Sequence, residues 1–225
     1  ARISNAGIPI FLLVGNHDLP SAANRATAVD IFATLQVPHV TVGDNLQNYL
    51  VNTKAGPLQV LAVPWPRRSG ILTRDESRGL TIMEVRDAIQ ERMTAAIGLR
   101  ASELDPQMPA VMAGDYNVIP QAEDAAKPEA WTEDALYLPE TRAAFRRVLN
   151  LGFTEAFRAR TQGPGHYSFW DYQAGAWQRN NGIRIDHLLL TPQAADLMTD
   201  VQIDRDIRGR DKPSDHVPVW IDLAA

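Results

Sequence analysis

Residues 110–117 have the sequence Ala-Val-Met-Ala-Gly-Asp-Tyr-Asn, and residues 184–190 have the sequence Arg-Ile-Asp-His-Leu-Leu-Leu. In each, a short apolar run typical of a buried strand lies next to polar groups. The predicted strands are residues 8–14, 39–42, 49–53, 59–63, 110–113, 185–190 and 217–223. Between them, apolar residues recur at spacings of three and four over residues 22–35, 81–99 and 141–149, which predicts helices. This alternation predicts a layered α/β domain.

Two local signals mark boundaries along the chain. Thr81 and Glu84 have the spacing of a capping box, so we expect Thr81 to be the N-cap of the second helix. Residues 104–109 contain prolines at 106 and 109 and form the best candidate linker. We therefore expect two halves, residues 1–108 and 109–225.

Composition excludes several classes of site and protein. The chain of 225 residues is 45% apolar and 22% charged, which is ordinary for a globular protein, and it has no membrane-spanning run of apolar residues. It has no cysteine, so any metal must be held by oxygen or imidazole. The chain begins at Ala1 rather than methionine, and we interpret it as a fragment, a processed product or an engineered product.

The net charge of −5 argues against indiscriminate binding to nucleic acid, although a local basic face can still hold a phosphate backbone. Two stretches could supply such a face or could equally be ordinary solvated surface. They contain Arg142, Arg146, Arg147, Arg158 and Arg160 in the first, and Arg205, Arg208, Arg210 and Lys212 in the second.

The first chemical motif is Asp115-Tyr-Asn117, directly after a predicted strand. This arrangement presents two oxygen-bearing side chains from one loop, where they can hold a hard cation or an attacking water. The alternative is an ordinary turn rich in Asp and Asn.

The second motif is Asp186, which lies inside a strongly apolar run. Burying a carboxylate costs several kcal/mol unless it is paired with a donor. His216, with Asp215 beside it at the start of the last predicted strand, is a suitable partner, because a carboxylate that fixes the tautomer of a histidine prepares it for proton transfer. We therefore predict a contact between Asp186 and His216.

Together with residues 167–172 (Tyr-Ser-Phe-Trp-Asp-Tyr) and residues 176–186, these motifs resemble the exodeoxyribonuclease III family of apurinic endonucleases, within the endonuclease/exonuclease/phosphatase superfamily. The likeness is nearly continuous over residues 109–222. It implies a four-layer α/β sandwich, possibly fused or incomplete here, and hydrolysis of phosphodiesters in duplex DNA with Mg²⁺ or Mn²⁺.

The resemblance also assigns roles to single residues. It implies that Asp115 orients or deprotonates the attacking water, and that Asn117 helps to hold the phosphate. Asp215 belongs to the metal shell, to which Asp115 and Asn117 also contribute, while His216 contacts the phosphate and Asp186 supports it. The residues assigned to DNA are Phe169 and Trp170, which would line the pocket for an abasic sugar, and Arg184. Core packing is the alternative for the two aromatic residues.

The first half departs from this family. Residues 1–108 contain no Trp-Asn-x-Asn strand, no Leu-Gln-Glu segment and no Tyr-x-Pro-Asn-Gly loop, so the glutamate expected as the main metal ligand is missing. Residues 7–112 instead resemble the calcineurin-like metallophosphoesterases, and among them the nuclease subunit of SbcCD. The similar segments are residues 7–18, ending in Gly-Asn-His-Asp, residues 63–68 and residues 79–81.

In that second family, Asn16 would be a metal ligand and His17 would contact the scissile phosphate. The other ligand motifs of that family are absent, and a bare Gly-Asn-His-Asp match can also be a turn. We predict a chimera, natural or engineered, joined near residues 109–114. The two halves then either pack as one sandwich or collapse separately and expose apolar faces.

Three functions remain open from sequence. The chain is a metal-dependent DNA nuclease, a non-catalytic scaffold with incomplete sites, or a module that binds DNA without hydrolysis. The first is favoured, with duplex DNA as partner, no membrane partner, a cytoplasmic location and an oligomeric state that the sequence does not reveal.

Overall fold

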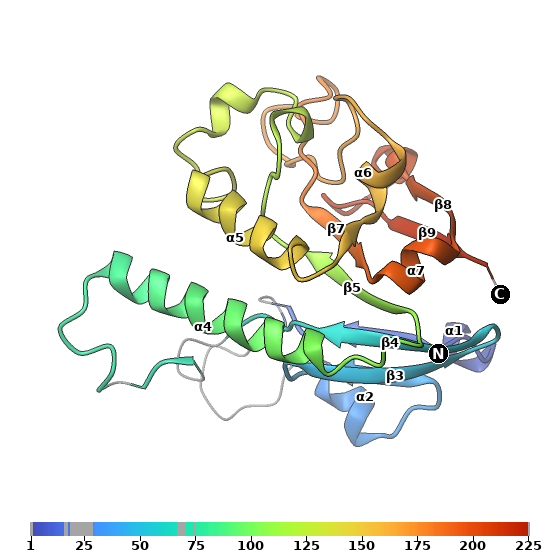
Figure 1. The fold of residues 1–225 in the computed structure, drawn as a ribbon. Coiled ribbons are helices and arrows are strands. Elements are labelled where there is room, and N and C mark those ends of the chain that lie inside the picture. The colour runs from blue at the N-terminus through green and yellow to red at the C-terminus, as the bar shows by residue number, and fades with distance from the viewer. Residues whose placement is uncertain (1, 16–17, 19–28, 67–70, 74, 225) are drawn as a thin grey trace. The chain divides into compact units, whose positions relative to one another are not determined.

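The computed structural model describes residues 2–15, 18, 29–66, 71–73 and 75–224. The chain divides into two compact units, Ala1–Met112 and Ala113–Ala225. Most of the helices and strands are labelled in Figure 1. Within the described residues, every helix is too short or too polar to cross a bilayer.

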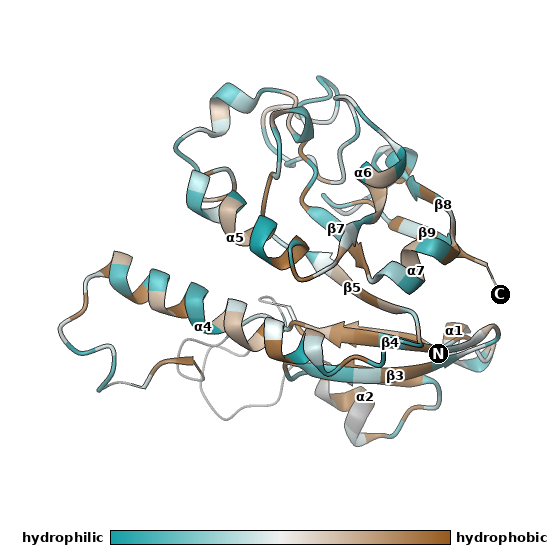
Figure 2. Cartoon of the chain, in the orientation of Figure 1, coloured by the Kyte–Doolittle hydropathy of each residue, from teal (hydrophilic) through white to brown (hydrophobic). Residues whose placement is uncertain are grey.

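The first unit is a mixed α/β assembly. Its elements are α1 (Arg2–Asn5), β1 (Ile10–Leu13), α2 (Asp30–Thr34), β2 (Val40–Gly43), β3 (Gln47–Thr53), β4 (Gly56–Ala62) and α4 (Ile82–Ser102), followed by the start of β5 (Ala110–Asp115). Strands β1 and β2 pair in parallel, and β3 and β4 form an antiparallel hairpin. Strand β4 then pairs in parallel with β5, with Gln59 opposite Ala110. Apolar residues dominate β4, which is brown over much of its length in Figure 2.

The predicted strands of this unit are confirmed, with ends displaced by at most three residues. The predicted helix over residues 22–35 is described only at its end, as α2, because residues 19–28 lie outside the described part of the chain. Helix α4 starts as predicted. The Thr81 hydroxyl accepts a hydrogen bond from the Glu84 backbone N–H at 3.2 Å, and the Glu84 carboxylate accepts one from the Thr81 N–H at 2.7 Å. Both partners of the capping box are therefore present.

The proline-containing segment before β5 is fastened to β4 by one side chain. The buried amide of Gln59 donates to the carbonyls of Asp105 and Met108, at 3.0 and 3.2 Å, and accepts from the Asp105 N–H at 2.8 Å. A glutamine in a strand interior is thus fully bonded to irregular backbone, which fixes where the parallel strand β5 begins.

The second unit carries the residues singled out by the sequence. After the end of β5 come η2 (Ala122–Asp124), η3 (Pro128–Trp131), α5 (Pro139–Leu149), β6 (Thr154–Glu155), α6 (Ala156–Arg160), β7 (Asp186–Leu190), α7 (Pro192–Leu197), β8 (Met198–Ile203), η4 (Arg205–Gly209) and β9 (Val219–Leu223). In the strand order β7 lies between β5 and β6, and β8 pairs with β9 in a separate antiparallel sheet. The sequence did not predict β6 or β8.

Two apolar clusters form the core around the candidate site. One contains Ile119, Ala125, Ile183 and Ile185, and the other contains Tyr167, Trp170, Ala176 and Val217. The segments that carry the predicted motifs, before β7 and before β9, therefore contribute to both the core and the site. Packing on one side and polar groups on the other fix the backbone from which the functional side chains project.

Candidate active site

Asp115 and Asn117 lie at the carboxyl end of β5, as the sequence predicted. The two carboxylate oxygens of Asp115 accept hydrogen bonds from the backbone N–H of Asn117, at 2.9 Å, and from its side-chain amide, at 3.1 Å. Asn117 has a φ of 49°, a left-handed conformation that asparagine tolerates better than most residues. The loop is an Asp-Asn turn in which Asn117 is exposed and the Asp115 side chain is partly buried.

The predicted contact between Asp186 and His216 is confirmed. His216 Nδ1 lies 2.9 and 3.1 Å from the two carboxylate oxygens of Asp186, the first residue of β7. The hydroxyl of Ser168 accepts hydrogen bonds from the backbone N–H groups of Ile185 and Asp186, both at 3.2 Å, and so fixes this end of the strand. The Asp186 carboxylate thereby holds the proton of His216 on Nδ1 and sets the direction of the ring.

His216 also faces Asp115. Its Nε2 lies 3.9 Å from a carboxylate oxygen of Asp115, and the two side chains are 32% and 35% exposed. This distance exceeds that of a hydrogen bond, so both atoms remain available to a third group. The geometry therefore brings three predicted residues, Asp115, Asp186 and His216, to one place on the second unit.

The environment shifts two pKa values at this place. The hydrogen bond to Asp186 raises the pKa of His216 against the opposing effect of burial, and the charges of Asp186, Asp115 and Asp215 act in the same direction as that bond. Burial raises the pKa of Asp115, against the hydrogen bond from the Asn117 N–H, and the Asp186 charge raises it further. Both changes favour the protonated form of the group concerned.

A metal centre built by protein groups alone is not present in the described residues. They contain no group of three or more His, Cys, Asp or Glu side chains arranged to hold an ion. Asp215 receives a weak hydrogen bond from the Ser214 hydroxyl at 3.3 Å, and Asn16 lies outside the described residues. Mg²⁺ in enzymes commonly binds one or two carboxylates and completes its shell with water and phosphate. Asp115, with the Asn117 side chain bound to it, fits that partial role.

Two of the three residues assigned to DNA, Trp170 and Arg184, are buried in the structure. Trp170 is 0% exposed and donates its indole N–H to Asn180, at 3.3 Å, an environment that agrees with the core-packing alternative. Arg184 is 1% exposed and its charge is neutralised inside the unit. Phe169 is half-buried, and its ring lies 5.0 Å from that of His216. Of these three residues, only Phe169 borders the candidate site.

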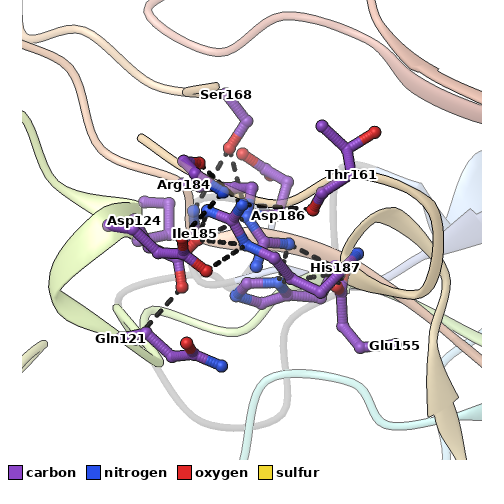
Figure 3. Close-up of polar contacts among 12 residues, drawn as sticks. Gln121, Asp124, Glu155, Thr161, Ser168, Arg184, Ile185, Asp186 and His187 are labelled. Atoms are coloured by element: carbon purple, nitrogen blue, oxygen red, sulfur yellow. Dashed lines mark hydrogen bonds and ion pairs between the residues drawn. The ribbon is translucent and has the colours of Figure 1, made fainter. Parts of the chain in front are cut away.

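Arg184 belongs to a set of buried polar and charged residues that the sequence did not predict; Figure 3 labels Asp124, Glu155, Arg184 and His187 among them. We call this set the buried charge network; it contains Asp124, Glu155, Arg158, Arg184 and His187. Asp124 accepts from Arg184 Nε at 2.8 Å and from Arg158, and Glu155 accepts from Arg184 Nη1 at 2.7 Å. Burial opposes ionisation of Glu155, but the charge of Arg184 and the hydrogen bond from the Arg158 N–H act against it, and the pKa of Glu155 lies well below its usual value.

One signal could have revealed the network. Arg184 stands in the same apolar run as Asp186, and the argument that a buried charge needs a partner applies equally to both. The same burial limits the predicted basic face, because Arg158 and Arg208 are also buried. His17 and Asn16, and Arg67 and Arg68 of the other resemblance, lie outside the described residues.

Residues 41–216 match the Endonuclease/Exonuclease/phosphatase family. Among curated proteins, the chain is 35% identical over 150 residues to the exodeoxyribonuclease of Bacillus subtilis, covering 66% of this chain and 56% of that one. It is 34% identical over 128 residues to exodeoxyribonuclease III of Haemophilus influenzae, covering 54% and 48%. The chain belongs to the Endonuclease/Exonuclease/phosphatase family, and it spans about half the length of these curated relatives.

Solved structures agree on the fold. A 3′–5′ exonuclease of Neisseria meningitidis superimposes with a TM-score of 0.61 at 25% identity, and an AP endonuclease of Archaeoglobus fulgidus with 0.60 at 24% identity. Each match covers 80% of this chain and 65% of the other. The predicted α/β sandwich class is confirmed. The family match begins at residue 41, inside the first half of the chain, and both the metallophosphoesterase resemblance of that half and the chimera remain predictions.

Proposed function

We propose that the second unit carries the hydrolytic site of a DNA repair nuclease of the exodeoxyribonuclease III and apurinic endonuclease type. The observation that carries the proposal is the arrangement of Asp186, His216 and Asp115, in which one histidine is bound by one carboxylate and faces a second. The curated relatives, which are exodeoxyribonucleases, support the same chemistry.

In this proposal each side chain has a separate task. Asp186 orients His216, whose protonated Nε2 donates a hydrogen bond to a phosphate oxygen and stabilises the charge that develops there. Asp115 accepts the proton of the attacking water, and Asn117 holds the Asp115 carboxylate in place. The water oxygen forms the new bond to phosphorus as the bond to the leaving oxygen breaks, so no protein group becomes covalently attached.

A divalent cation is part of the proposal, because nucleases of this type generally depend on one. Mg²⁺ or Mn²⁺ would neutralise charge on the phosphoryl oxygens. Asp115 is the carboxylate best placed to hold it, with Asn117 and Asp215 as the remaining predicted oxygen donors. We further propose duplex DNA as the substrate and the cytoplasm as the location.

The test is cleavage of a labelled duplex with one abasic site, in Mg²⁺, in Mn²⁺ and with chelator. We expect chelator-sensitive cutting by the chain and by Asp196→Asn, a control on the exposed surface of α7. Asp115→Asn and His216→Asn should each lower the rate by about 100-fold or more, the usual loss when a proton-transfer group is removed. Absence of cutting by a folded chain would refute the proposal.

A second candidate is duplex binding without hydrolysis, on a scaffold that combines parts of two enzymes. The observation that favours it is the lack of a three-residue metal cluster in the described part of the chain. Here the first unit would be the metallophosphoesterase-like part, with Asn16 and His17 as remnants of its site. It predicts salt-dependent binding of duplex DNA that Phe169→Ala weakens, with no turnover in any metal.

A further inference from the structure

Asp186 and His187 are consecutive residues of β7 and therefore point to opposite faces of the strand. Asp186 reaches His216, whereas His187 is turned into the protein, where it is 1% exposed. The His187 ring packs against the rings of Tyr116 and Phe145, with centroid distances of 5.7 and 4.9 Å. A buried imidazole one residue away from the site must have both ring nitrogens satisfied.

Both nitrogens of His187 have a partner, and the partners define the tautomer. Nε2 lies 3.1 Å from the carbonyl oxygen of Val118, which can only accept a hydrogen bond. Nδ1 lies 3.0 Å from Nη1 of Arg184, which can only donate one. The two contacts are satisfied together only by a neutral ring with its proton on Nε2. A carboxylate oxygen of Glu155 is also near Nδ1, but at the longer distance of 3.5 Å.

Arg184 is itself held on both sides, as Figure 3 shows. Its Nε donates to Asp124 at 2.8 Å and its Nη1 to Glu155 at 2.7 Å. Asp124 in turn accepts from the backbone N–H of Gln121 at 3.0 Å. The donor that faces His187 therefore belongs to a fixed guanidinium and not to a mobile side chain.

The other ring nitrogen of His187, Nε2, reaches the loop of the candidate site through Val118. Val118 follows Asn117, the residue with left-handed backbone that binds Asp115. On the other side of Asn117, the backbone N–H of Tyr116 donates to the carbonyl of Ile185 at 3.0 Å. The turn is thus tied to the segment that carries Asp186 on both sides, once by backbone and once by the His187 side chain.

We propose that His187 is a positioning residue that holds the Asp115–Asn117 turn in register with Asp186 and His216 through its hydrogen bond to Val118. This inference rests on the proposed function for its effect on turnover, because it deepens the account of that site. Its structural part, the tautomer of His187 and the restraint on Asn117, is independent of turnover.

The test compares His187→Phe, which keeps a ring of similar size but has neither nitrogen, with His187→Gln, whose amide can still donate to the Val118 carbonyl. The matched control is His166→Phe, in which the replaced ring also packs against an aromatic residue, Phe157, at 5.2 Å. We expect His187→Phe to lower kcat about tenfold to a hundredfold with KM within about twofold of the unchanged chain, because displacement of reacting groups by ~1 Å has an effect of that size. His187→Gln should recover most of the loss, and His166→Phe should leave kcat unchanged.

Nitrogen-15 NMR of the unaltered chain supplies a second readout that needs no turnover. We expect the His187 ring to show a protonated Nε2 and a bare Nδ1, and His187→Phe to speed amide hydrogen exchange at Asn117 and Val118. A proton on Nδ1, unchanged exchange at Asn117, or a His187→Gln rate no higher than that of His187→Phe would overturn the inference. If the unaltered chain shows no turnover, the proposed function fails, and the NMR measurements alone decide the positioning role.

Discussion

Replacing Asp124 by asparagine tests whether the buried charge network stabilises the second unit. Asp124 is 0% exposed and accepts hydrogen bonds from two arginines, Arg184 and Arg158. Asp124→Asn preserves the shape of the side chain but removes its charge, and the new amide hydrogens face arginine donors. Two buried guanidinium groups would then lose their shared partner.

The expected loss of stability depends on the ion pairs that Arg184 and Arg158 keep after the substitution. Removing one partner of a buried ion pair costs about 3–5 kcal/mol. Glu155 still binds Arg184 at 2.7 Å, and Glu123 lies 3.4 Å from Arg158, so we expect the lower end, a loss of about 3 kcal/mol. For a chain of this length, 1 kcal/mol corresponds to roughly 2–4 °C, which gives a decrease in Tm of about 6–12 °C.

Tryptophan fluorescence during thermal and urea unfolding measures this loss in the right part of the chain. Four of the five tryptophans, Trp131, Trp170, Trp177 and Trp220, belong to the second unit. The control is Asp196→Asn, the same chemical change at an exposed position of α7, which should stay within about 0.5 kcal/mol. A loss of less than about 1 kcal/mol for Asp124→Asn would show that the network does not stabilise the unit.

Three shorter predictions concern protonation and packing. Because the pKa of Glu155 falls from 4.5 to about 2 on folding, its contribution to stability is present above pH 4.5 and is lost as the pH falls towards 2; Glu155→Gln should flatten the dependence of Tm on pH in that window. Asp186→Asn should lower the pKa of His216, seen as a lower NMR titration midpoint of its ring. An unchanged midpoint in Asp186→Asn would contradict the pairing of Asp186 with His216. The stability that the raised pKa of His216 supplies is present below pH 6.5 and is lost as the pH rises through the pKa of the folded state. Gly182→Ala would place a Cβ 2.5 Å from Nε1 of Trp170, and we expect urea unfolding to show a loss of about 1–3 kcal/mol.

The fold was predictable wherever the signal was local. Hydrophobic runs and the capping box at Thr81 gave β3, β4, β5, β7 and α4 with small errors at their ends. Strand β8 was missed because its sequence, Met-Thr-Asp-Val-Gln-Ile, is too polar to stand out, and its stability depends on pairing with β9. Strand β8 therefore forms because it pairs with β9, and the periodicity of its own sequence does not predict it.

Within the candidate site, too, some features were predictable from the sequence and others depended on tertiary contacts. The cost of burying Asp186 was enough to predict His216 as its partner, although the two residues are 30 positions apart. Arg184 was assigned to DNA, whereas the structure binds it to Asp124, 60 positions away, inside the unit. A sequence motif states which groups are present, but it does not state on which side of a strand the solvent lies.

The sequence by itself thus determined strands β3, β4, β5 and β7, the start of helix α4, and the need of Asp186 for a partner. These features depend on short-range periodicity, capping chemistry and the cost of burying one charge. Only the tertiary structure decided which charges are internal, that Trp170 packs in the core, and that His187 links Arg184 to Val118. Those outcomes depend on contacts between segments distant along the chain, where burial and hydrogen-bond partners are set jointly by several elements and by no single one of them.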